Sequence, residues 1–134
     1  MQKLLLSIND YEDNLYNQLK RKTGYQPQTN KEINEMVILW CKDREKAIKL
    51  YGNISNWDTS KITDMSRLFS NHRIYGHWAY NDFNDDISNW NVSNVTDMCS
   101  MFYHCKSFNQ PLNKWNVSNV THMGCMFCTC NSFN

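Results

Sequence analysis

Between residues 53 and 134, one order of apolar and polar positions occurs three times. The second occurrence reads Trp-Asn-Val-Ser-Asn-Val-Thr-Asp-Met from Trp90 to Met98, and the third repeats it with His122 in place of the aspartate. The first occurrence, which begins at Trp57, keeps the central serine and the final Thr-Asp-Met. This repetition predicts one supersecondary unit per copy, stacked on its neighbours, because one copy cannot bury its apolar side alone.

The copies follow each other at a nearly fixed distance. Trp90 and Trp115 are 25 residues apart, whereas Trp57 lies 33 residues before Trp90. The additional residues of the first copy fall between Phe69 and Phe83, and 71–80 fits no position of the repeat. We therefore predict copies at about 54–86 (with the insert 71–80), 87–111 and 112–134.

Aromatic and polar residues recur at equivalent positions, so stacking should place like residues on like residues. An aromatic ring buries roughly 150–250 Å², which suits a core poor in leucine and valine. We expect the repeated asparagines and threonines to hydrogen-bond from copy to copy. The predicted rows are Trp57, Trp90 and Trp115; Met65, Met98 and Met123; Phe69, Phe102 and Phe127; Phe83, Phe108 and Phe133; Asn84, Asn109 and Asn134; and Thr63, Thr96 and Thr121.

Residues 1–52 lack the repeat and have the spacing of amphipathic helices. Gly24 should interrupt the first helical segment, and the capping-box pair Thr29 and Glu32 predicts the start of the next helix. Asp43 is placed to begin a short helix over 44–51, which Gly52 would end. The apolar stripe of the middle helix is Ile33, Met36, Val37 and Trp40.

We interpret 1–52 as a helical N-terminal cap and 53–134 as the repeat region. An exposed end of a repeat stack needs a covering element of different sequence, because its apolar core would otherwise meet water. The alternative for residues 1–22 is a separate arm that docks elsewhere.

The repeat resembles that of the BspA-type leucine-rich-repeat surface proteins, related copies of which occur in mycoplasma lipoproteins, protists and large DNA viruses. The resemblance rests on Trp-Asn-Val-Ser-Asn-Val-Thr-Asp-Met-x-x-Met-Phe and the following Ser-Phe-Asn-Gln-Pro-Leu, and it covers about 51–134. It implies a solenoid of short strands and tight turns, attachment or protein binding at cell or particle surfaces, and no catalytic residues. We therefore expect an α+β fold, a helical N-terminal cap followed by a short leucine-rich-repeat-like solenoid of about three 25-residue repeats.

Composition narrows the classes of function and location. The formal net charge of +1 argues against nucleic acid as a partner, and no apolar run approaches the roughly 18–20 residues that span a bilayer. The apolar start at 4–8 is too short for a signal peptide, and no small-residue cleavage site follows it. We expect a cytoplasmic or virus-particle-associated protein, encoded by a virus or a protist, rather than a secreted one.

The insert is the first candidate binding site. Its side chains are large and partly polar, as those that anchor protein interfaces often are. The alternative is a loop that folds back over the edge of the repeats. The candidate binding residues are Tyr75, His77, Trp78 and Tyr80.

The third copy is the second candidate. It closes at Asn134 without a covering segment, so we expect unpaired backbone groups and exposed core at Phe133. A protein partner, self-association through this uncapped repeat and a truncated repeat array are the open explanations.

A cysteine cluster offers a different class of function. Cys125, Cys128 and Cys130, with His122 close by, have ligand types that zinc selects. Each cysteine, however, occupies an ordinary repeat position, where free cysteine packs as a small apolar residue. A small metal- or redox-binding module is therefore the alternative to packing.

Acidic residues also recur, at Asp64 and Asp97, but we expect them to accept backbone N–H bonds in turns. No nucleophile or phosphate-binding loop accompanies them. The sequence thus predicts no enzyme activity and no cofactor, but a non-enzymatic protein-binding or structural attachment module, as a surface or virus-particle component.

Overall fold

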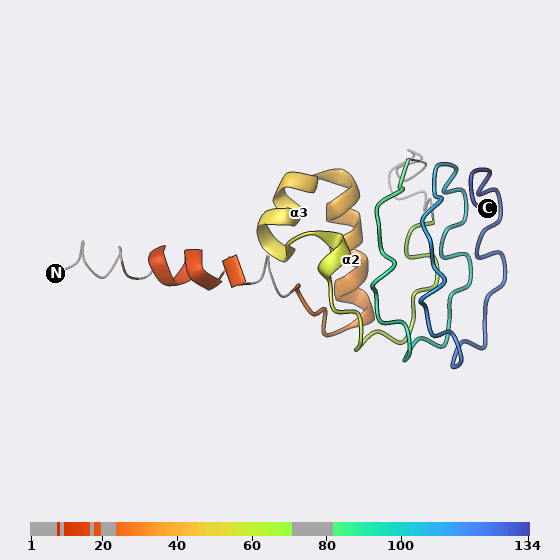
Figure 1. The fold of residues 1–134 in the computed structure, drawn as a ribbon, viewed down its shortest axis with the longest axis horizontal. Coiled ribbons are helices and arrows are strands. Elements are labelled where there is room, and N and C mark those ends of the chain that lie inside the picture. Colours follow the sequence, from red (N-terminus) through yellow and green to blue (C-terminus); the bar gives the residue numbers. More distant parts are fainter. Residues whose placement is uncertain (1–7, 9, 17, 20–23, 71–81) are drawn as a thin grey trace.

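The computed structural model describes residues 8, 10–16, 18–19, 24–70 and 82–134. Its named elements are α2 (Asn30–Lys42), α3 (Arg44–Tyr51) and a short 3-10 helix η1 (Ile54–Asn56), and residues 10–16 are also helical. In Figure 1, α2 and α3 lie together at one side of the repeat region, and the third copy lies at the opposite side.

Local sequence explains both named α-helices, and their prediction is confirmed. The Thr29 hydroxyl accepts the Glu32 N–H at 3.1 Å and so caps α2. The Asp43 carboxylate accepts the Lys46 N–H at 3.1 Å and caps α3, which ends at Gly52 with φ +74°. The predicted stripe of α2 is its buried side: Ile33, Met36, Val37 and Trp40.

The predicted α+β fold with a leucine-rich-repeat-like solenoid is wrong. A solenoid of that kind is built mostly from strands, whereas the described residues have helices as their regular secondary structure and contain no named β-strand. Extended pairing is limited there to the isolated parallel bridges Asp64–Asp97 and Asp97–His122.

Tight turns explain why strands do not form. In the second copy, the N–H groups of Trp90, Val95 and Met101 each bond to the carbonyl three residues earlier, at 3.0–3.2 Å. Ser100 and His104 have φ of +55° and +65°, which no extended strand contains. Because turns interrupt the extended backbone every few residues, the described residues form isolated bridges and no continuous β-ladder.

The three copies nevertheless lie against each other through equivalent groups. The Met65 and Phe69 N–H groups donate to carbonyls of the second copy at 2.9 Å, and the Met98 N–H donates to a carbonyl of the third at 2.8 Å. The rings of Phe69, Phe102 and Phe127 are spaced 5.4 Å apart and are nearly parallel.

A second phenylalanine row and two polar rows are confirmed as well. Phe83, Phe108 and Phe133 stack at 5.8 Å, and the Asn109 N–H donates to the Asn84 side-chain oxygen at 2.8 Å. The Thr96 hydroxyl donates to the Thr63 carbonyl at 3.2 Å. These rows hold the copies at a fixed spacing because the phenylalanine rings and the polar groups named here contact their equivalents in the next copy.

The helices cover the first copy with specific contacts. The Asn30 side-chain oxygen accepts the Thr63 N–H at 3.1 Å, and the Trp40 ring packs edge-on against Trp57 with centroids 5.8 Å apart. Asp85 accepts hydrogen bonds from the Trp40 indole at 2.9 Å and from Arg44 at 2.7 Å. Gly24 has φ +78°, and a Cβ there would lie 1.5 Å from the Asn56 carbonyl oxygen, so this approach requires glycine.

Candidate protein-binding surface

The third copy exposes apolar side chains whose equivalents in the second copy are buried. Met123 is 43% exposed and Val117 39%, whereas the equivalent Met98 and Val92 are 0% and 1% exposed. We call this surface the outer face; its described members are Leu112, Val117, Val120, Met123, Phe127 and Phe133. The side that buries the core in the second copy therefore remains largely open in the third.

Backbone donors line the outer face. In the second copy, Met98, Ser100 and Phe102 donate their N–H groups to the third copy at 2.8–2.9 Å. The equivalent donors of the third copy are the N–H groups of Met123, Cys125 and Phe127, and they have no acceptor among the described residues. An unpaired row of this kind is a template for another chain.

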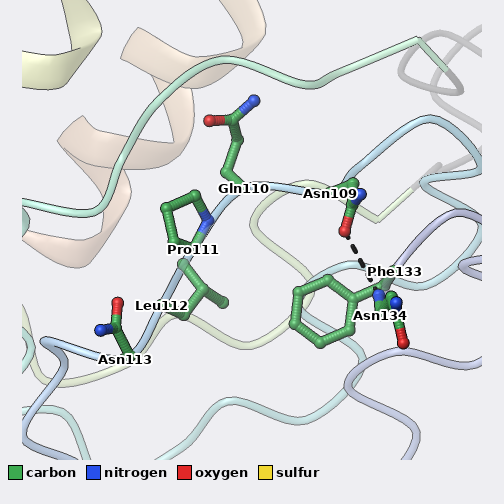
Figure 2. A pocket seen from close by; sticks show the side chains of 7 residues that line it. All are labelled: Asn109, Gln110, Pro111, Leu112, Asn113, Phe133 and Asn134. Atoms are coloured by element: carbon green, nitrogen blue, oxygen red, sulfur yellow. Dashed lines mark hydrogen bonds between the residues drawn. The ribbon is translucent and has the colours of Figure 1, made fainter.

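A cavity adjoins the outer face. It has a volume of about 580 Å³, and the rings of Phe133 and Pro111 and the Leu112 side chain supply its apolar lining (Figure 2). Amide side chains supply the polar lining, and one of them is fixed, because the Asn134 N–H donates to the Asn109 oxygen at 3.2 Å. The remaining lining residues are Gln110 and Asn113. A side chain of a partner could enter here beside the backbone row.

Residues 40–134 match a family described as "Mycoplasma protein of unknown function, DUF285". The chain belongs to this family. The match includes all three copies, α3 and the end of α2. No curated protein and no solved structure matches the chain.

Within this DUF285 region, the predicted binding residues fall in two groups. Phe133 lies on the outer face, half-buried, with its ring centroid 4.1 Å from that of Phe127. The insert residues lie outside the described residues: Tyr75, His77, Trp78 and Tyr80. Sequence reasoning missed Met123 and Val117, because both occupy apolar repeat positions whose equivalents in the second copy, Met98 and Val92, are buried.

The cysteine cluster is divided in the structure. The Cys130 thiol is buried and donates to the Phe102 carbonyl at 2.7 Å, as the Cys105 thiol does to the Phe69 carbonyl at 3.0 Å. Burial raises the pKa of both thiols. Cys130 therefore occupies a packing position of the repeat.

The other members of the cluster lie nearer the surface. Cys125 is exposed, and its hydrogen bond with Cys128 raises the pKa of the Cys128 thiol. The His122 ring bonds to the Thr121 hydroxyl at 2.9 Å. Among the residues that the structure describes, no three His, Cys, Asp or Glu side chains are grouped to hold a metal ion.

The recurring aspartates act within turns, as predicted. Asp64 accepts the Ser66 N–H and Asp97 accepts the Cys99 N–H, both at 2.8 Å. These bonds fix the turns that contain Met65 and Met98. Over the described part of the chain, no helix is long and apolar enough to cross a membrane.

Proposed function

We propose that this chain is a non-enzymatic protein-binding module whose outer face holds its partner. The observation that carries the proposal is the exposure of Met123 and Val117 at positions where the second copy is buried. Exposed apolar side chains gathered on one side, beside polar groups, are typical of interaction sites.

The outer face has a rigid support. Phe127 stacks on Phe102 at 5.4 Å, and Phe133 stacks on Phe108 at 5.8 Å. The rings of Phe102 and Phe108 are themselves fully buried. A partner would therefore meet rings that are already ordered. Such pre-organisation reduces the entropy that binding costs.

We further propose that the module serves structural attachment, as a surface or virus-particle component. The resemblance of its repeat to those of BspA-type surface proteins supports this role, and membership in DUF285 is compatible with it.

Site-specific cross-linking tests the proposal. A photoreactive amino acid at Val117 should capture a partner from the native host, and the same residue at Glu45 on α3 should not. The captured protein is then purified and titrated with the unmodified chain. Binding should weaken at least about tenfold in Met123→Asp, because a carboxylate would lose its water in an apolar contact.

The matched control is Tyr103→Asp, a substitution at an exposed residue of the second copy. It should leave binding unchanged. A partner that cross-links equally from position 45, or that binds Met123→Asp as well as the unmodified chain, would show that the outer face is not the binding surface.

A further inference from the structure

The contact between the second and third copies shows which groups fit the outer face. Carbonyls of His122, Gly124 and Met126 accept the donors of the second copy, at intervals of two residues. The N–H groups of Met123, Cys125 and Phe127 repeat those donors 25 residues later. A row of carbonyls with the same interval would pair with all three.

The outer face also presents acceptors, in a separate segment. The Thr121 N–H donates to the Thr96 carbonyl at 2.9 Å, and the Asn119 side chain donates to the Ser93 carbonyl at 2.6 Å. The equivalent Thr121 and Ser118 carbonyls accept no such bond among the described residues. A complementary partner thus places donors opposite 118–121 and carbonyls opposite 123–127.

We propose that the occupant of the outer face is a further repeat of this type, carried by another polypeptide that presents its carbonyl side. The inference rests on the proposed function and identifies the class of partner. Such a repeat pairs with both backbone segments and extends the rows of Phe127 and Phe133. Its phenylalanines would stack as those of the third copy stack on the second.

A second copy of this chain is a poorer occupant, because the equivalent side of its first copy is covered. Asn30 already accepts the Thr63 N–H at 3.1 Å there, and the Trp40 ring packs on Trp57. Two outer faces that meet with their segments parallel would place donors against donors. The two sides of a copy are therefore complementary to each other, whereas two outer faces are not complementary in this parallel arrangement.

The test uses the full chain, labelled with nitrogen-15, and an unlabelled synthetic peptide with the sequence of residues 110–134, in reducing buffer. The peptide should bind, and a peptide of the same composition in scrambled order should not. At saturation, amide exchange of Met123, Cys125 and Phe127 should slow at least about tenfold, as expected for newly paired amides. Exchange at Met98, Ser100 and Phe102 should not change.

Other outcomes overturn the inference. Binding without slower exchange at the three amides would mean apolar contact only, and an equally bound scrambled peptide would mean non-specific adsorption. A chain that dimerises alone with these amides protected would make self-association the function of the face. If the peptide does not bind while a cross-linked host protein still requires Met123, the proposed function stands and the repeat is not its partner.

A second measurement avoids the free peptide, which could aggregate before it binds. The chain extended after Asn134 by another copy of residues 110–134 supplies the same contact within one molecule. Its Met123, Cys125 and Phe127 amides should exchange as slowly as those of Met98, Ser100 and Phe102, to within about tenfold. Fast exchange at these amides would overturn the proposed pairing.

Discussion

The two ends of the repeat region differ in how their apolar side chains and backbone polar groups are covered. At the first copy, α2 takes the place of a preceding repeat. The Asn30 side chain accepts the Thr63 N–H at 3.1 Å, just as the Thr63 carbonyl accepts the equivalent Thr96 N–H at 2.8 Å. At the third copy, the described residues provide no such replacement, and Met123 is 43% exposed. A covering helix thus has to match backbone polarity as well as apolar shape.

The consequence is a difference in burial between equivalent residues. Phe69 is fully buried between rings of the first and second copies, at 4.0 Å from Phe83 and 5.4 Å from Phe102. Phe127 likewise contacts one ring of its own copy, Phe133, and one of the adjacent copy, Phe102, but it is only half-buried. Stability should therefore depend strongly on residues near the helices and weakly on residues of the outer face.

Replacing these two phenylalanines measures the comparison most directly. Phe69→Ala should lower the free energy of unfolding by about 3–5 kcal/mol, because it leaves a closed cavity. Phe127→Ala should cost about half as much or less, since water can reach its position. Urea unfolding followed by tryptophan fluorescence gives both values, and equal losses would contradict the comparison.

Two glycines provide a second matched pair. Gly24→Ala should destabilise the protein by about 2 kcal/mol or more, because Gly24 has φ +78° and its new Cβ would meet the Asn56 carbonyl at 1.5 Å. Gly124→Ala, on the third copy, meets nothing closer than the Cys99 sulfur at 3.8 Å and should shift stability by less than about 1 kcal/mol. Thermal unfolding would measure both, and a larger loss for Gly124→Ala would reverse the assignment.

The carboxylate that joins the helices to the end of the first copy gives an intermediate effect. Asp85→Ala removes the acceptor of the buried Trp40 indole and of Arg44, and should cost about 1–3 kcal/mol. Glu35→Ala is the control, because Glu35 forms an exposed helical ion pair with Lys31 and should change stability by less than about 0.5 kcal/mol. Chemical denaturation would measure both, and similar losses would show that Asp85 only adds surface charge.

The smallest expected effect is the alkaline dependence of stability. The hydrogen bond from the Tyr25 hydroxyl to Glu32 raises the pKa of Tyr25 from 10.0 to about 12. Because the folded protein holds this proton more tightly, its contribution is complete below pH 10 and is lost as the pH rises to about 12.

Tyr25→Phe should remove that part of the alkaline loss, which we expect to be about 1 kcal/mol after solvent screening. Denaturation at a series of pH values between pH 9 and pH 12, the range set by the Tyr25 pKa, would measure this loss of unfolding free energy. Tyr103→Phe, in the second copy, should keep the full dependence. An identical loss in Tyr25→Phe and in the unmodified chain would place its cause elsewhere.

Local signals in the sequence were sufficient for the helices and for the rows. Thr29 and Asp43 start α2 and α3 because a side-chain oxygen three residues before an N–H can cap it in any context. The ladders of Phe102 and Phe108 follow from repetition alone, since equivalent residues must meet when copies stack.

The prediction of strands is wrong, and the spacing of the apolar residues gives the physical reason. Apolar residues of the second copy follow each other mainly at intervals of three residues, not two, as from Val95 to Met98 and Met101. That spacing matches turns whose N–H bonds to the carbonyl three residues earlier, as Val95 does to Val92 at 3.0 Å. The family resemblance outweighed this signal.

The candidate site was only partly predictable. Phe133 was identified from its repeat position, but Met123 was placed in a core row, where Met65 and Met98 are fully buried. The pattern could not reveal which member of a row lacks a neighbour on its outer side. The division of the cysteines also required the structure, because Cys130 turns inward and Cys125 outward only once the turns are formed.

The sequence by itself determined the number of copies, their spacing, the starts of both helices and which residues stack, because all of these depend on local capping or on repetition. Only the tertiary structure decided that the copies pair through turns without strands, that Asn30 and Asp85 fasten the helices to them, and that the outer face remains open. Those features depend on contacts between segments 25 or more residues apart, where backbone polarity and burial are set jointly by both partners.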